Sequence, residues 1–143
     1  MKIIFWGTPD YSLESLKLLI DSNHEIKAVV SQPDKKRSRG KNLVASPVKK
    51  YAVLNNIPVL TPDKIINNNS FVKALKSFNS DVFIVIAYGK ILSKEILDIP
   101  RYGSWNAHAS LLPRWRGAAP IQWSLLKGDL HTGVGIMKME EGL

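Results

Sequence analysis

The sequence predicts a doubly wound α/β fold built on a mainly parallel sheet. Short apolar runs rich in β-branched residues alternate with helical patterns, which is the order that gives parallel strands joined by helices. The run VFIVIAY at residues 82–88 is apolar throughout, as expected for a strand that helices cover on both faces. The chain has 143 residues, 45% of them hydrophobic and 22% charged, so we expect one domain with one core.

The first half of the chain opens with KIIFW, a buried strand that ends at the turn GTPD. The helix that follows places Leu13, Leu16, Leu19 and Ile20 on one face. A second helix begins at Ser46-Pro47, a pair typical of a helix start. The expected strands lie at residues 2–6, 25–32 and 57–62, the last between prolines, and the helices at 10–24 and 47–56.

The second half repeats the alternation. An apolar strand at residues 81–89 is followed by a short helix and by a strand, GSWNAHA, that ends in polar residues. Strands are therefore expected at 81–89, 103–109 and 133–139, and helices at 70–79, 93–99 and 118–128.

Composition excludes several classes of protein. There is no cysteine, which removes a disulfide scaffold, a thiolate metal site and a cysteine nucleophile. The apolar start is cut after Trp6, too early for a signal peptide, and no apolar run approaches the roughly 20 residues that span a bilayer. We expect a soluble cytoplasmic protein with no membrane partner; the sequence does not determine the oligomeric state, for which a monomer is favoured.

The net charge of +8 is concentrated in one segment. Residues 35–50 carry seven of the eight net positive charges and no acid. Such a segment fits contact with an anionic polymer. A solvated basic loop that serves solubility is an equal alternative from charge alone.

Ligands of doubly wound folds bind outside the carboxyl ends of the strands, where the strand order reverses. That rule selects the turn GTPD, the segment AYGK after the fourth strand and the segment NAHAS after the fifth. The turn GTPD lacks the glycines of a dinucleotide fingerprint, and Pro9 removes a backbone donor. No phosphate-binding G-x-x-x-x-G-K-[ST] motif occurs either, so the crevice is expected to hold a ligand other than NAD or ATP.

Asn106 and His108 stand two residues apart at the end of a strand, so their side chains share one face. An amide donor beside an imidazole can stabilise an oxyanion and handle a proton, as acyl transfer requires. A structural role is the commoner use of such a pair when the pattern is taken alone. A metal site is not expected, because His108 has no second ligand at suitable spacing and His24 and His131 fall in predicted turns.

The stretch NAHASLLPRWRGAAPIQWSLLKGD at residues 106–129, followed by TGVGIMKMEEGL, resembles the folate-dependent formyltransferases, whose hallmark is Asn-x-His-x-Ser-Leu-Leu-Pro. IIFWGTPD, SQPDKKRSRGK with SPVK, and AYGKIL extend the resemblance along the whole chain. Within the family it is most similar to the enzymes that act on methionyl-tRNA. Trp6 departs from the pattern, since many members carry a smaller residue there.

The resemblance implies a Rossmann-like formyltransferase domain and a role for each motif. Asn106 and His108 would hold the formyl oxygen of 10-formyltetrahydrofolate, the formyl donor, while an amine attacks. The folate site would comprise Ala87, Tyr88, Gly89, Ile91, Leu92, Ser110, Leu111, Leu112 and Pro113. The leucines and proline also suit a core and turn role. The contacts to initiator methionyl-tRNA would come from Lys35, Lys36, Arg37, Arg39, Lys41, Arg114 and Arg116, although the last two could instead cap their own loop.

The family also has an aspartate in an Asp-Thr-Gly segment that would follow Leu143, and a basic C-terminal β-barrel domain. Residues 1–143 are therefore expected to be an incomplete catalytic domain with little turnover of their own. Two alternatives stay open at this point: a formyltransferase for an amino sugar or glycinamide ribonucleotide, and a non-catalytic folate-binding or tRNA-binding module. Steep salt dependence of binding would favour tRNA over a small acceptor.

Overall fold

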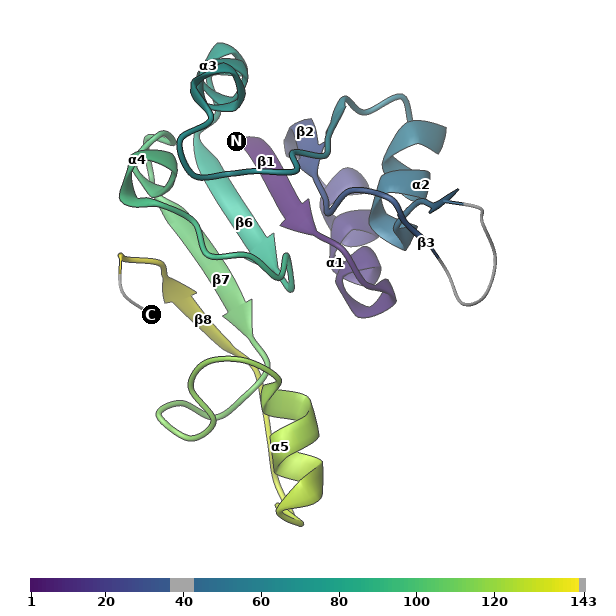
Figure 1. Cartoon of the computed structure of the whole chain (residues 1–143). Coiled ribbons are helices and arrows are strands. Elements are labelled where there is room, and N and C mark those ends of the chain that lie inside the picture. The colour runs from purple at the N-terminus through teal and green to yellow at the C-terminus, as the bar shows by residue number, and fades with distance from the viewer. Residues whose placement is uncertain (37–42, 142–143) are drawn as a thin grey trace.

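The computed structural model describes residues 1–36 and 43–141, which form a six-stranded sheet with helices on both faces (Figure 1). The strand order is β5-β2-β1-β6-β7-β8, and every neighbouring pair is parallel except β7 with β8. The strands are β1 (Lys2–Gly7), β2 (Glu25–Val30), β5 (Val59–Leu60), β6 (Val82–Ile86), β7 (Ser104–His108) and β8 (Gly135–Lys138). The predicted fold class is confirmed.

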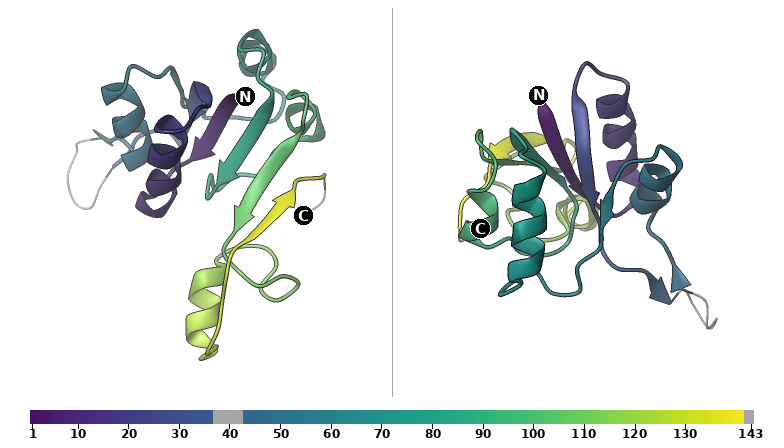
Figure 2. Two further views of the ribbon diagram at one scale, coloured as in Figure 1. Left: turned by 180° about the vertical axis from the view of Figure 1, so that it is seen from behind. Right: turned by 90° about the horizontal axis from the view of Figure 1, so that it is seen from above.

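Two helices cover each face of the sheet (Figure 2). Helices α1 (Asp10–Ile20) and α2 (Pro47–Leu54) lie on one face, and α3 (Asn69–Ser77) and α4 (Lys94–Leu97) on the other. The predicted start of α2 is confirmed in detail: Ser46 is the N-cap, its hydroxyl accepts the Lys49 N–H at 3.0 Å, and Pro47 occupies the first turn.

The apolar core is split between the two faces because side chains alternate along each strand. Phe5 of β1 packs with Leu16 of α1 and Val48 of α2. On the opposite face, Trp6 of β1 packs with Phe83 of β6. Leu13, Leu19 and Ile20 also contact the first cluster, so the helical face predicted for α1 is confirmed.

All of the expected strands and helices occur, but most are shorter than their patterns indicated. The strand expected at residues 57–62 retains only Val59–Leu60, at the edge of the sheet. The segment expected to be a loop contains an unpredicted antiparallel pair, β3 (Lys35–Lys36) and β4 (Leu43–Val44). Two-residue strands carry too little periodicity to be recognised in a sequence.

An arm extends beyond the carboxyl end of β7 (Figure 1). It comprises residues 109–134 and contains helix α5 (Pro120–Leu126). Ser124 is the one buried residue of α5, whereas Leu125 and Leu126 are about three-quarters exposed. The chain then returns along β7 as β8.

Candidate active site

Strand order reverses between β1 and β6, because the chain proceeds from β1 to β2 and β5 on one side and from β6 to β7 and β8 on the other. The three segments selected from the sequence follow β1, β6 and β7 at their carboxyl ends. Since these strands are parallel, the segments lie along the same edge of the sheet. The three segments therefore lie at the point where the strand order reverses, which is where ligands of such folds bind.

The backbone carbonyl of Tyr88 joins the ends of three strands. It accepts hydrogen bonds from Thr8 Oγ1 at 3.2 Å, after β1, and from Gln32 Nε2 at 3.0 Å, after β2. The backbone N–H of Gln32 in turn donates to Thr8 Oγ1 at 3.4 Å. Sequence reasoning did not single out Thr8 or Gln32, whose contacts with Tyr88 become visible only in the folded chain.

The segment at residues 87–92 has an unusual backbone. Ala87 and Gly89 have φ values of 49° and 83°, in the left-handed region that glycine tolerates and alanine rarely adopts. Lys90 Nζ donates to the carbonyls of Pro62 and Asp63 at 3.0 and 2.8 Å, which ties the segment to the chain before α3. The segment is thus held at Tyr88 and at Lys90 by groups distant in sequence.

The Tyr88 side chain is 1% exposed and packs edge-on against Trp6, with ring centroids 5.1 Å apart. Burial raises the pKa of the Tyr88 phenol above its usual value, so the group is neutral. Trp6, where the resemblance led us to expect a smaller residue, therefore directly supports the segment at residues 87–92.

Asn106 and His108 project from the same face of the sheet as Tyr88. Asn106 is paired with Val85, whose side chain belongs to the core cluster that contains Tyr88 and Leu92. Directly paired residues of neighbouring parallel strands share a face, and His108 follows two residues later on that face. The structure therefore places the two polar side chains on the face that also carries the segment at residues 87–92, and both are partly exposed.

The imidazole of His108 contacts the backbone of the arm. Its Nε2 lies 2.9 Å from the carbonyl oxygen of Trp115, seven residues further along the chain. Ser110 bonds back to β7 through its N–H, which donates to the His108 carbonyl at 2.9 Å. The Ser110 hydroxyl is buried and has no partner within residues 1–36 and 43–141.

The remaining predicted folate residues differ in exposure. Leu92 is 3% exposed and belongs to the core, whereas Ile91 is 76% exposed. Leu111 and Leu112 are 55% and 39% exposed and pack against the glycines that precede and begin β8. Pro113 is also exposed. Leu92 thus anchors the segment, and the other apolar side chains present surface at this end of the sheet.

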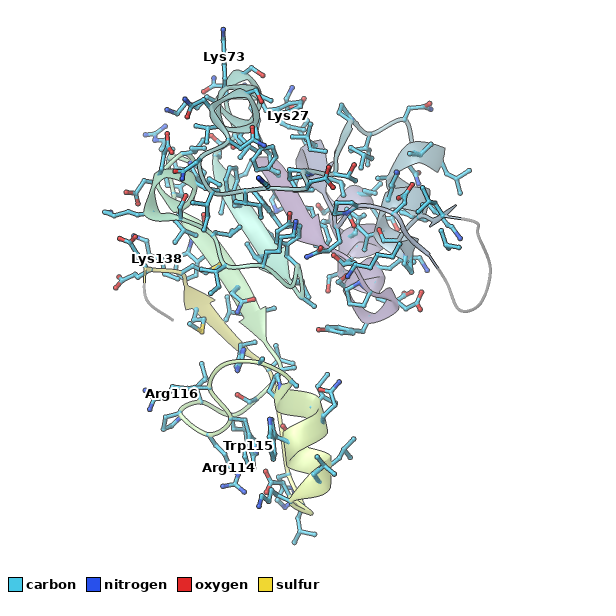
Figure 3. All side chains as sticks on the ribbon, in the orientation of Figure 1. Lys27, Lys73, Arg114, Trp115, Arg116 and Lys138 are labelled. Carbon is cyan, nitrogen blue, oxygen red and sulfur yellow. The ribbon has the colours of Figure 1, made fainter. Side chains whose placement is uncertain are left out.

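Arg114 is held by an acid that the sequence analysis did not assign. Asp129 Oδ2 accepts from Arg114 Nε at 2.8 Å, and Oδ1 accepts from the Arg114 guanidinium at 2.5 Å. Hydrogen bonds from Arg114, and then from the Trp115 indole, lower the pKa of Asp129 to about 2. Arg114 lies with Trp115 beside α5, while Arg116 is exposed and lies away from the helix (Figure 3). The sequence contained a signal for this ion pair. No acidic residue occurs between Asp98 and Asp129, so Asp129 is the first acid that follows Arg114 along the chain.

Side-chain contacts join the basic segment, residues 35–50, to the residues that precede it. Lys49 Nζ bonds both carboxylate oxygens of Asp34 at 2.8 Å, and the hydroxyls of Ser31 and Ser46 lie 2.6 Å apart. Lys35 is exposed and its strand β3 pairs with β4. Lys36 follows it in β3, and Arg37, Arg39 and Lys41 lie outside the described residues.

Neither a metal-binding cluster nor a membrane-spanning helix occurs among the described residues. No group of three or more His, Asp or Glu side chains is arranged to hold a metal ion in residues 1–36 and 43–141. Within the same residues, no helix has the length and apolar character needed to cross a bilayer. His24 and His131 are exposed, as expected for surface histidines.

Known proteins resemble this chain over its full length. A family model described as formyl transferase matches residues 1–143. A methionyl-tRNA formyltransferase of Prochlorococcus marinus is 72% identical over 143 residues, covering 100% of this chain and 44% of the relative. The chain therefore spans less than half the length of the curated relatives that it matches.

Solved structures share the fold at low sequence identity. A glycinamide ribonucleotide transformylase of Geobacillus kaustophilus superposes with a TM-score of 0.76 at 19% identity, covering 99% of this chain and 76% of that one. A formyltetrahydrofolate deformylase of Pseudomonas syringae gives a TM-score of 0.75 at 18% identity, covering 99% and 47%. At these identities the likeness concerns the arrangement of strands and helices alone.

Proposed function

The chain belongs to the formyl transferase family, and we propose that it carries the site at which a formyl group passes from 10-formyltetrahydrofolate to the α-amine of initiator methionyl-tRNA. The observation that carries this proposal is the placement of Asn106 and His108. They lie at the carboxyl end of β7, on the sheet face that also holds the segment at residues 87–92. The name of the relative that is 72% identical supports the choice of acceptor.

The residues present suit a folate. Ile91, Leu111 and Leu112 offer exposed apolar surface, against which a flat ring system can pack. The backbone groups of Ile91 and Leu92 make no hydrogen bond to another of the described residues, so they are available to the polar edge of such a ring. The bound folate would supply an activated formyl carbonyl.

Asn106 and His108 then have separate tasks. The Asn106 amide N–H donates to the formyl oxygen as negative charge develops on it. His108 accepts a proton from the attacking amine as the new C–N bond forms. As imidazolium it returns that proton to the folate nitrogen when the old C–N bond breaks. The products are formylmethionyl-tRNA and tetrahydrofolate.

The tRNA would approach along the basic segment, residues 35–50, in which β3 and β4 form an antiparallel pair; we call this pair the basic hairpin. This hairpin follows β2, so it leaves the same edge of the sheet as the arm that follows β7. Lys49 forms an ion pair with Asp34, so its charge is neutralised within the protein and Lys49 is not assigned to the tRNA. We assign the tRNA contacts to Lys35, Lys36, Arg37, Arg39 and Lys41, with Arg116 nearer the catalytic pair.

The catalytic assignment is tested with the product of the complete reading frame that encodes these residues. Asn106→Ala removes one oxyanion donor and is expected to lower kcat by about 10²-fold to 10³-fold. His108→Ala removes the proton acceptor and is expected to lower kcat by about 10²-fold to 10⁴-fold. Formylation of methionyl-tRNA is measured with radiolabelled methionine. Near-normal rates for both variants would refute the assignment.

The acceptor assignment is tested by the salt dependence of tRNA binding. Arg39→Ala with Lys41→Ala is expected to flatten the slope of log K against log salt by about 2, one unit per lost phosphate contact. Lys73→Ala with Lys76→Ala on α3 makes the same change in charge at the far end of the molecule and serves as the control (Figure 3). If both double variants give the wild-type slope, the hairpin does not bind tRNA and a small acceptor is favoured.

A further inference from the structure

A cluster outside the catalytic pair joins α5 to the loop that follows β7. Besides its two bonds to Arg114, the Asp129 carboxylate accepts a hydrogen bond from Trp115 Nε1 at 2.6 Å. Its side chain is only 12% exposed. We call Asp129, Arg114 and Trp115 the Asp129 clamp.

Stacking reinforces the clamp. The Arg114 guanidinium lies over the Trp115 ring, 4.4 Å from its centroid. The Trp115 ring also stacks on Trp123 of α5, with centroids 5.9 Å apart and planes 11° from parallel. The indole is thus fixed by a cation, by a second indole and by a carboxylate.

The clamp holds a backbone conformation that tryptophan seldom adopts. Trp115 has a φ of 57°, in the left-handed region. Such a conformation persists only where surrounding contacts fix it. The side-chain contacts of the Asp129 clamp supply that restraint.

The restrained residue is the one whose carbonyl contacts His108. A carbonyl oxygen can only accept a hydrogen bond, so at 2.9 Å the Nε2 atom of His108 must carry the proton. In the neutral imidazole Nδ1 is then unprotonated and can accept a proton. The position of the Trp115 carbonyl therefore determines which ring nitrogen is available for chemistry.

We propose that Asp129 is a positioning residue for His108: it fixes Trp115, and the Trp115 carbonyl holds His108 in the Nε2–H tautomer with Nδ1 free to accept the proton of the attacking amine. The inference rests on the proposed function of His108. It adds a residue that lies 21 positions away from that histidine and does not touch it. It also gives Arg114 a structural role that does not require tRNA.

The test is the tautomer of His108, read from the ¹⁵N chemical shifts of histidine-labelled protein in alkaline buffer. The wild-type protein is expected to show His108 as the Nε2–H tautomer, assigned by its absence from His108→Ala. Asp129→Asn loses the charge that holds Arg114 and is expected to give mixed tautomers. Trp115→Phe keeps an aromatic ring but loses the Nε1 donor, and the same mixing is expected. His24, which lies outside the arm between α1 and β2, acts as the internal reference and should not change.

Kinetics provide the second readout. Asp129→Asn is expected to lower kcat by about tenfold to a hundredfold, by analogy with the loss of a partner that orients a metal-binding histidine. Its KM for methionyl-tRNA should stay near the wild-type value, because the inference gives the Asp129 clamp the role of holding His108 and not that of binding tRNA. Asp129→Glu keeps the carboxylate and should recover part of the Nε2–H tautomer and part of kcat. Asp98→Asn removes the acid of an ion pair with Lys94 before the amino end of β7, and should change neither.

Three results would overturn the inference. His108 could be the Nδ1–H tautomer in the wild-type protein, could keep the Nε2–H form in both clamp variants, or could change tautomer with no change in kcat. Should Asp129→Asn fail to fold, Trp115→Phe decides by the same criteria. Failure of the proposed function is separate: His108→Ala would then retain formyl transfer, whatever the tautomer of His108.

Discussion

The Tyr88 carbonyl allows a quantitative test of how the candidate site is assembled. Thr8→Val and Gln32→Met are near-isosteric changes that each remove one of its two hydrogen-bond donors. Thr8→Val also removes the acceptor of the Gln32 N–H, a contact that is weak because it is 3.4 Å long. In either single variant the buried carbonyl keeps a partner, so the free energy of unfolding should fall by about 1 kcal/mol. In the double variant the carbonyl of Tyr88, a residue 1% exposed, has no partner left.

An unpaired buried acceptor costs about 1 to 3 kcal/mol more than a paired one. We therefore expect the double variant to lose about 3 kcal/mol or more, which exceeds the sum of the single variants by about 1 kcal/mol. Urea denaturation of the wild-type protein, the two single variants and the double variant measures the four unfolding free energies of this double-mutant cycle. Ser77→Ala removes a hydroxyl that donates to an exposed helix carbonyl, and should change the unfolding free energy by less than about 0.5 kcal/mol.

The reasoning would be refuted if the effects of the single variants add within about 0.5 kcal/mol, since the carbonyl would then not depend on these two donors. The stability cycle does not depend on the proposed function. If that function holds, the double variant should also raise the KM for 10-formyltetrahydrofolate more than either single variant, because the segment at residues 87–92 loses its attachment to β1 and β2.

Three further predictions concern the same edge of the sheet. Ser46→Ala removes the cap of α2 and the partner of Ser31, and calorimetry should show a loss of about 1 to 2 kcal/mol. Gly7→Ala places a Cβ 2.7 Å from Phe5 Cε1 and 3.1 Å from a backbone oxygen; overpacking should cost about 1 to 3 kcal/mol in urea denaturation. Because the pKa of Asp129 falls from 3.8 to about 2 on folding, its stabilisation is complete above pH 3.8 and is lost as pH falls towards 2. Tryptophan fluorescence should report that loss of stability at low pH, and the Asp129→Asn variant should not show this pH dependence.

Local patterns were sufficient for most of the architecture. The apolar run of β6 and the leucines on one face of α1 indicate which residues of a short segment are buried. The hydrophobic effect favours burial of those residues, so the local pattern was enough to predict both elements. The order of strands and helices then limits the topology, because parallel connections are short and right-handed. Strand ends were less well predicted, since a strand lasts only as long as it pairs with a neighbour; β5 pairs with Val29 and Val30 of β2 alone and so has two residues.

The candidate site was predictable only in part. Asn106 and His108 were found because residues two positions apart on one strand necessarily share a face. The placement of the segment at residues 87–92 on that same face depends on the register between β6 and β7, which the sequence does not express. Arg114 was expected to meet the tRNA or cap its loop; its pairing with Asp129 depends on the fold of the arm.

By itself, the sequence determined the α/β class, the family and the concentration of positive charge, and it predicted the edge of the sheet at which we propose the chemistry. The tertiary structure alone decided that Thr8 and Gln32 meet at the Tyr88 carbonyl, 80 and 56 residues away along the chain. It also decided that Asp129 holds Trp115, 14 residues away. The physical reason is that a hydrogen bond requires two groups within about 3 Å, and only the path of the whole backbone brings groups so distant in sequence to that separation.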